Sequence, residues 1–190
     1  MGEAVGDRVQ DAIVGNARKS AVRPTPQQYF MLLAVATRER AACLRRHVGA
    51  ILVSDQRIIA TGYNGTPTGF PNCDEGGCHR CSHPEDYAEG RGYDVCICVH
   101  AEQNALLQAA KIGYSVQGSQ CYSTLRPCFG CLKELYQAGV AAVYYLNAWA
   151  PSVPLEAEAY DALLAEMQAR GVSVEPLELP ESLLDLRAAT

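Results

Sequence analysis

The stretch HAEQNALLQAAK, residues 100–111, predicts a helix, because good helix formers fill it and Gly113 follows as a stop. Two side chains suited to metal binding and proton transfer, His100 and Glu102, stand at its start. A second stretch of this kind is PCFGC, residues 127–131, at the start of another predicted helix. The sequence therefore predicts two helices whose N-terminal ends both carry chemically active groups.

Helices and strands are expected to alternate on both sides of these stretches. The expected elements are a helix over 27–42 that starts at Thr25-Pro26, a hairpin of strands over 48–54 and 57–62, strands over 119–125, 141–146 and 172–177, and helices over 127–138 and 155–170. Residues 64–98 form a long loop rich in Gly, Pro, Cys and His, which inside a compact domain needs a function or a metal clip. This order predicts an α/β fold with a mixed sheet and helices on both faces.

The size and charge of the chain suit a single domain that acts on a small molecule. We expect the domain over residues 25–178, with an accessory segment over 1–24 and a tail over 179–190. The net charge of −5 and the scarcity of Lys/Arg clusters favour a small metabolite over nucleic acid as the partner. No long apolar run or apolar signal core is evident, so we expect a cytoplasmic protein without a membrane partner.

His100, Cys128 and Cys131 provide three ligands of the kinds that zinc prefers, and a catalytic zinc keeps its fourth position for water. The two cysteines are three residues apart, which places them on the same side of a helical turn. Helix N-termini also favour ionised thiolates. Glu102 follows His100 by two residues, so we expect it beside the ion rather than bound to it, where it can exchange protons with an activated water.

A closed zinc site that only stabilises the fold is the alternative, but it needs a fourth protein ligand and leaves Glu102 without a role. The pattern H-x-E followed by P-C-x-x-C is typical of zinc-dependent deaminases. We therefore predict that a zinc-activated water attacks C4 of a cytosine-type base. Glu102 then protonates N3 and helps the amino group to leave as ammonia.

The chain resembles the deoxycytidylate deaminase family of the cytidine deaminase superfamily. The resemblance is carried by CLRRHVGAILV (43–53), IIATGYNGTPTGFPNCDEGGC (58–78), VHAEQNALLQAAKIG (99–113), and TLRPCFGC (124–131) followed by LYQAGVAAVYY (135–145). It implies a cytidine-deaminase-like three-layer α/β/α fold with a mixed five-stranded sheet. It also implies conversion of dCMP to dUMP, a step that feeds dTMP synthesis, in homo-oligomers that are often hexamers. Some members of the family are regulated by dCTP and dTTP, which makes these nucleotides candidate effectors.

The segment Gly62-Tyr63-Asn64-Gly65 is the candidate substrate loop. Asn-Gly is a common turn pair, so the residues alone favour a turn. The resemblance implies that the segment recognises sugar and base, with Asn64 on the sugar and Tyr63 and Gly65 beside it. The backbone N–H of Ala101 is the candidate donor to the cytosine carbonyl.

Three arginines are candidates for binding the 5′-phosphate: Arg45, Arg46 and Arg126. For Arg45 and Arg46 the alternative is a solvated surface charge. Arg126 directly precedes the Pro-Cys pair and must lie near the site, although other deaminases often have an apolar residue or Ser there.

Six further cysteines lie outside the catalytic pattern, near His79 and His83, and they are either reduced, partly buried thiols or metal ligands. Disulfides are disfavoured without a secretory signal. The resemblance implies a second, structural zinc, which would tie the long loop to the first helix. Its expected ligands are Cys43, Cys73, Cys78 and Cys96, with Cys98 or Cys81 as alternates; Cys121 is expected in the core.

Two other functions stay open. The first is a deaminase of the same superfamily that acts on free cytidine, tRNA adenosine or single-stranded DNA, which should show basic or aromatic surfaces around its pocket. The second is a non-catalytic zinc scaffold related to bacterial competence proteins, which would have no need of Glu102.

Overall fold

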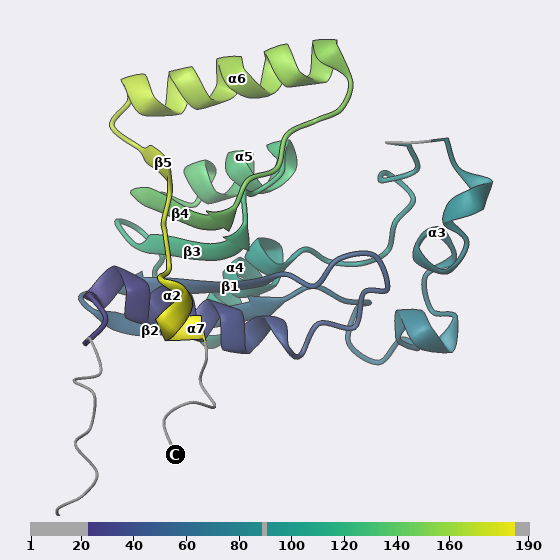
Figure 1. The fold of residues 1–190 in the computed structure, drawn as a ribbon, viewed down its shortest axis with the longest axis horizontal. Helices are drawn as coiled ribbons and strands as arrows, with labels where there is room; N and C mark the ends of the chain where they lie inside the picture. Colours follow the sequence, from purple (N-terminus) through teal and green to yellow (C-terminus); the bar gives the residue numbers. More distant parts are fainter. Residues whose placement is uncertain (1–22, 89–90, 185–190) are drawn as a thin grey trace, which may run out of the picture.

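A mixed five-stranded sheet forms the centre of the computed structural model, which describes residues 23–88 and 91–184 (Figure 1). Its strands are β1 (Gly49–Ser54), β2 (Arg57–Tyr63), β3 (Gln120–Leu125), β4 (Ala142–Asn147) and β5 (Ser173–Pro176), in the order β2-β1-β3-β4-β5. The pairs β1–β2 and β1–β3 are antiparallel, whereas β3–β4 and β4–β5 are parallel. The prediction of a mixed five-stranded sheet is confirmed.

Helices cover both faces of this sheet. Four long helices are α2 (Pro26–Arg38), α4 (Ala101–Ile112), α5 (Phe129–Gln137) and α6 (Pro154–Ala169); the short ones are α3 (His79–Ser82), α7 (Glu181–Leu184) and two 3₁₀ turns, η1 (Cys73–Glu75) and η2 (Pro84–Asp86). Figure 1 shows α2 in front of the sheet and the fainter α4 and α5 behind it. The predicted three-layer α/β/α arrangement is therefore confirmed. No helix in the described ranges is long and apolar enough to cross a membrane.

The core follows the alternation of side chains along the strands. In β1, Ile51 and Val53 face α2 and pack with Phe30, whereas Leu52 faces the opposite side and packs with Ala105 of α4. Each of these five side chains is at most 4% exposed. Two separate apolar layers therefore hold the helices against the sheet, and the site at the start of α4 is built on a rigid support.

Helix α2 begins as predicted but is shorter than predicted at its C-terminal end. Thr25 caps it: its Oγ1 accepts a hydrogen bond from the Gln28 N–H at 3.2 Å, and the Gln28 side chain accepts one from the Thr25 N–H at 2.9 Å. The helix ends at Arg38 instead of continuing to Ala42. The Ala42 N–H donates instead to the Asn64 carbonyl at 3.1 Å, so the chain turns toward the loop that follows β2.

Gly62 allows β2 to pack directly beneath the first turn of α4. A Cβ at this position would lie 2.1 Å from the Ala101 carbonyl oxygen and 2.5 Å from the Ala105 nitrogen. A larger residue would therefore push away the helix that carries His100 and Glu102. This close approach gives the glycine of the predicted substrate loop a structural role.

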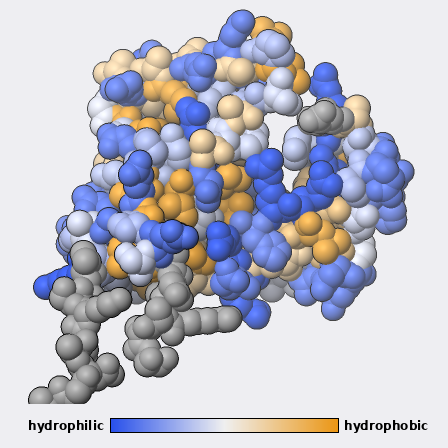
Figure 2. Space-filling view, viewed as in Figure 1, coloured by the Kyte–Doolittle hydropathy of each residue, from blue (hydrophilic) through white to orange (hydrophobic). Residues whose placement is uncertain are grey.

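The segment between β2 and α4 forms a lobe, defined here as residues 66–88 and 91–98, beyond one end of the sheet (Figure 1). The face of the lobe seen in Figure 2 is largely hydrophilic, whereas hydrophobic residues gather in the middle of the main body. At the other end of the chain, Leu177 and Leu179 pack against the layer that contains Phe30. The predicted limits of the domain stay a prediction, because residues 1–22 and 185–190 lie outside the described part.

Candidate functional site

Two helix N-termini converge on a set of three candidate zinc ligands. His100 is the N-cap of α4, Cys128 is the N-cap of α5, and Cys131 lies in the first turn of α5. His100 Nδ1 lies 3.4 Å from the Sγ atoms of both cysteines, and all three ligand atoms are within 4.8 Å of one another. One imidazole and two thiols at this spacing fit a zinc ion with a position left for a non-protein ligand.

The protonation of these groups suits metal binding. Hydrogen bonds from Cys131 and His100 lower the pKa of Cys128 to about 4, against the opposing effect of its burial. The same pairing with Cys128 raises the pKa of His100 to about 9, and the hydrogen bond to Cys128 together with burial raises that of Cys131. The three groups thus share protons around the Cys128 thiolate, and a bound metal ion would displace those protons and take their place as the positive charge.

Glu102 is buried beside the candidate ligands and points its carboxyl group toward β3. It is 4% exposed, and its Oε1 accepts a hydrogen bond from Ser123 Oγ at 3.0 Å. Burial raises the pKa of this carboxyl and the charge on Cys128 raises it further, while its own backbone N–H, His100 and the Ser123 hydroxyl oppose the shift. A carboxyl group with a raised pKa and one oxygen held in place is suited to receive a proton and to give it back.

Neighbouring side chains hold the two helix starts. Gln103 accepts from the His100 N–H at 3.0 Å through its Oε1 and donates to Glu134 of α5 at 3.0 Å through its Nε2. Buried Tyr160 of α6 donates from its hydroxyl to the Pro127 carbonyl at 2.7 Å. These bonds fix the backbone on which the ligands stand.

The candidate substrate loop lies next to the site but is already engaged with the backbone. Asn64 Oδ1 accepts from the Val48 N–H at 2.7 Å, and its Nδ2 donates to the Arg46 carbonyl at 2.7 Å. Gly65 pairs with Val99, the residue before His100. An amide has two donor hydrogens and two acceptor lone pairs, so one of each remains on Asn64 for a ligand. The roles predicted for Asn64 and its neighbours, including exposed Tyr63, stay predictions.

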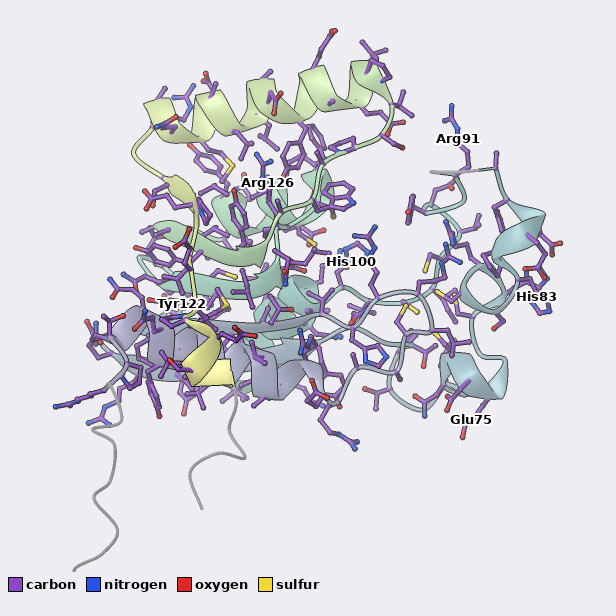
Figure 3. All side chains as sticks on the ribbon, in the orientation of Figure 1. Glu75, His83, Arg91, His100, Tyr122 and Arg126 are labelled. Carbon is purple, nitrogen blue, oxygen red and sulfur yellow. The ribbon has the colours of Figure 1, made fainter. Side chains whose placement is uncertain are left out.

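The three candidate phosphate-binding arginines have different surroundings. Arg45 and Arg46 are exposed on the surface. Arg126 is partly buried between two aromatic rings, with its guanidinium carbon 4.8 Å from the ring centre of Tyr160 and 5.7 Å from that of Tyr145. Its Nε is buried and has no hydrogen-bond partner. Figure 3 shows Arg126 between the sheet and α6.

The six cysteines outside the catalytic pattern come together where the lobe meets the sheet, and Figure 3 shows a group of sulfur atoms there. They are Cys43, Cys73, Cys78, Cys81, Cys96 and Cys98, and all are free thiols. The Cys98 thiol lowers the pKa of Cys43 and of Cys96, and the bonds to these two raise the pKa of Cys98 itself. The cluster thus contains the four expected ligands of the structural zinc and also both expected alternates, Cys81 and Cys98.

Sequence reasoning missed the residues that support the site from a distance, mainly Ser123 and Tyr160. Ser123 is fully buried on the face of β3 that points toward α4. Strict alternation along this strand, which also points Cys121 inward, could have indicated a buried polar side chain. No local pattern could have indicated Tyr160, because its partner Pro127 is distant in the sequence.

Comparison with known proteins accounts for this combination of fold and site. Residues 24–147 match the family model described as the cytidine and deoxycytidylate deaminase zinc-binding region. The chain belongs to the cytidine and deoxycytidylate deaminase family. The family resemblance inferred from the sequence is therefore confirmed.

Several members of this family are similar over most of the chain. Deoxycytidylate deaminase of Schizosaccharomyces pombe is 38% identical over 160 residues, which cover 84% of this chain and 46% of that protein. ComE operon protein 2 of Bacillus subtilis is 37% identical over 161 residues, covering 84% of this chain and 75% of that protein. The crystal structure of dCMP deaminase from cyanophage S-TIM5 in complex with dCMP and dUMP is 34% identical, with a TM-score of 0.59, and covers 82% of this chain and 98% of that one. This chain thus spans less than half the length of the Schizosaccharomyces relative.

Proposed function

We propose that this protein hydrolyses dCMP to dUMP and ammonia. The observation that carries the proposal is the placement of buried Glu102 beside the convergent set His100, Cys128 and Cys131. A structural zinc site would have no use for a buried carboxyl group in this position. The choice of dCMP is supported by the deoxycytidylate deaminases among the relatives and by the dCMP and dUMP bound in the cyanophage structure.

The residues of the chain have separate tasks in this reaction. His100, Cys128 and Cys131 would hold the zinc ion, which when bound supplies a water-derived nucleophile near neutral pH. The Glu102 carboxylate accepts a proton from the attacking water as its oxygen bonds to C4 of the cytosine. Glu102 delivers that proton to N3, takes the second proton from the new C4 hydroxyl and passes it to the amino group, so that the C4–N bond breaks, ammonia leaves and the C4 carbonyl of dUMP forms. Ser123 holds Oε1 of Glu102, leaving Oε2 to carry the proton.

Backbone and side-chain groups around the site would orient the nucleotide. Ala101 is the first residue of α4, so its N–H has no partner within the helix and can donate to the cytosine carbonyl. Asn64 keeps one donor and one acceptor for the sugar. Arg126 would bind the phosphate, because its buried Nε lacks a partner next to Pro127. Arg45 and Arg46 remain secondary candidates on the surface.

The cysteine cluster holds structural metal in this proposal. The buried hydrophobic cluster of the lobe consists of cysteines alone, so the described part of the lobe has no aliphatic core to stabilise it. Ordering a residue costs roughly 1–2 kcal/mol, and a structural zinc contributes about 10–16 kcal/mol in small zinc domains. Metal binding would therefore offset part of the cost of ordering the lobe.

A homo-oligomer in the cytoplasm, with dCTP and dTTP as effectors, completes the proposal. Leu107, Ile112 and Tyr114, on and just after α4, are 54–60% exposed, and such apolar groups favour contact with a second copy of the chain. Nine free thiols suit a reducing compartment. Light scattering tests the assembly: a monomer at micromolar concentration, with or without dCTP, would contradict it.

A nucleotide panel tests the proposed reaction. Zinc-loaded protein is incubated with dCMP, deoxycytidine, cytidine and a cytosine-containing oligonucleotide, with and without chelator, and ammonia is measured. We expect release from dCMP to be fastest and to be abolished by chelator. Faster ammonia release from the oligonucleotide would show that the substrate is a nucleic acid and not dCMP. No release from any of them would favour the alternative of a non-catalytic zinc scaffold. The similarity to ComE operon protein 2 is compatible with that alternative.

A further inference from the structure

The cysteine cluster contains more thiols than one zinc ion can bind. Four thiolates complete a tetrahedral zinc site, but six cysteines lie together here. Among them, Cys43, Cys73, Cys78 and Cys81 are at most 5% exposed and Cys98 is 8% exposed, while Cys96 is partly buried. Their Sγ contacts are 3.2–3.8 Å, far longer than the S–S bond of about 2.0 Å in a disulfide.

The six thiols divide into two groups of four that share one edge. The first group is Cys43, Cys73, Cys81 and Cys98; the second is Cys78, Cys81, Cys96 and Cys98. Within each group all four sulfur atoms lie within 4.8 Å of one another. The two shared sulfur atoms, those of Cys81 and Cys98, are 3.8 Å apart. Two tetrahedra that share an edge have six corners, which is the number of cysteines present.

The spacing of the sulfur atoms agrees with zinc tetrahedra. Zinc–sulfur bonds of about 2.3 Å place neighbouring corners about 3.8 Å apart. The Sγ distance is 3.6 Å for Cys43–Cys81, 3.7 Å for Cys81–Cys96 and 3.8 Å for Cys78–Cys96. Only Cys73–Cys98, at 3.2 Å, is clearly shorter and would have to open slightly. Contacts of nearly the right length therefore occur in both groups.

A buried cation, Arg80, lies next to the cluster in the sequence and packs against the rings of Tyr93 and Tyr87, with its guanidinium carbon 4.7 and 5.6 Å from their centres. Arg80, directly before the shared Cys81, is 5% exposed, and its Nε has no hydrogen-bond partner. Its Nη2 donates only to the Arg91 carbonyl at 3.0 Å, and no carboxylate in residues 23–88 or 91–184 forms an ion pair with it. Six thiolates with two zinc ions carry two negative charges, and a buried guanidinium in the same lobe is compatible with this net charge.

We propose that the cluster binds two zinc ions, with Cys81 and Cys98 as bridging thiolates, Cys43 and Cys73 completing one site, and Cys78 and Cys96 completing the other. The inference rests on the proposed structural metal site and is independent of the deaminase reaction. Cys98 lies two residues before His100, and Val99 between them pairs with Gly65. The two-ion cluster would therefore anchor both the candidate substrate loop and the segment that leads into His100.

Counting zinc by native mass spectrometry tests this proposal on the full chain. We expect three ions per chain in the zinc-loaded protein: one at His100, Cys128 and Cys131, and two in the cluster. The paired variants Cys43→Ser/Cys73→Ser and Cys78→Ser/Cys96→Ser should each lose one ion. The matched control is Cys121→Ala, which removes a buried cysteine outside the cluster and should keep all three.

The outcomes distinguish the two-ion cluster from a single structural zinc site and from the proposed deaminase reaction. Two ions in the parent, with one of the paired variants losing none, would show a single-ion site and overturn the binuclear cluster. One ion in the parent would overturn the structural site as well, and iron in place of zinc would also contradict the assignment. An inactive protein with three ions would contradict the deaminase and leave the cluster supported. If a paired variant fails to fold, ¹¹³Cd NMR of the cadmium-loaded parent decides, because only bridging thiolates couple two cadmium resonances.

Discussion

The molecule has two thiol-rich regions that use the same ligand chemistry in different ways. The candidate catalytic region takes three potential ligands from the starts of α4 and α5, on a rigid sheet, and places Glu102 beside them. The cluster takes six thiols from the lobe and its junctions and has no carboxylate among its donor groups. His100 and Cys128 are partly exposed, whereas most of the cluster is buried.

Under the proposed function, this difference separates a reactive metal centre from a structural one. Zinc with four protein thiolates has no position left for a substrate or water, whereas zinc with three protein ligands has one. The nearby carboxyl group then decides whether that position can be used for proton transfer. The predictions below test whether the two regions differ in this way.

Chelation should separate the regions with the largest effect. His100 and Cys128 are partly exposed, so a chelator would reach the proposed catalytic ion, whereas the buried cysteines would enclose the cluster ions. We expect mild chelation to remove one ion per chain and all ammonia release, and one equivalent of zinc to restore it. Zinc content and activity, followed in the same samples, check this. Loss of the cluster ions while ammonia release persists would contradict the assignment of the more accessible ion to the catalytic site.

Glu102→Gln should remove the chemistry and leave the metal in place. The amide has nearly the same shape but cannot accept the proton, so we expect kcat to fall by about 10²–10⁴-fold at unchanged zinc content. Glu158→Gln, an exposed position on α6, is the matched control and should retain full activity. Steady-state kinetics and metal analysis check this. Equal kcat values for the two variants would contradict the proton-transfer role of Glu102.

Ser123→Ala tests the positioning of the carboxyl group. The change removes the 3.0 Å hydrogen bond to Glu102 Oε1, and bonds to charged groups contribute about 1.5–3 kcal/mol. We expect kcat to fall by at least about tenfold, with little change in KM or zinc content. Ser119→Ala is the control, because Ser119 is equally buried but its hydroxyl has no partner. Equal kinetics for the two variants would show that Ser123 does not position Glu102.

Tyr160→Phe should have the smallest effect. It removes one hydrogen bond to the Pro127 carbonyl, which we expect to lower the free energy of unfolding by about 1 kcal/mol. Tyr29→Phe, at an exposed position, should change stability by much less. Urea denaturation measures both. A Tyr160→Phe protein as stable as the parent would show that the hydrogen bond from α6 to Pro127 does not stabilise the start of α5.

The sequence predicted the catalytic region better than the cluster, and the reason is physical. His100, Glu102, Cys128 and Cys131 are arranged by local helical geometry, so their spacing along the chain already reports their proximity. The alternation of apolar residues likewise predicted all five strands to within a few residues. Such features depend on short-range backbone structure.

Contacts between distant segments were not predictable in the same way. Cys43 meets Cys81 only because α2 ends at Arg38 and the chain then turns toward the lobe, against the prediction of a helix to residue 42. Nothing local indicated that all six cysteines would gather or that two would be shared. The Ser123–Glu102 contact also depends on how α4 packs on β3.

The most direct measurement is a crystal structure of the zinc-loaded protein with anomalous scattering at the zinc edge. We predict an ion bound by His100, Cys128 and Cys131, with a fourth ligand that is not a protein atom and the Glu102 carboxyl within hydrogen-bond distance of it. A protein side chain in that fourth position, or a Glu102 carboxyl turned away from it, would contradict the account.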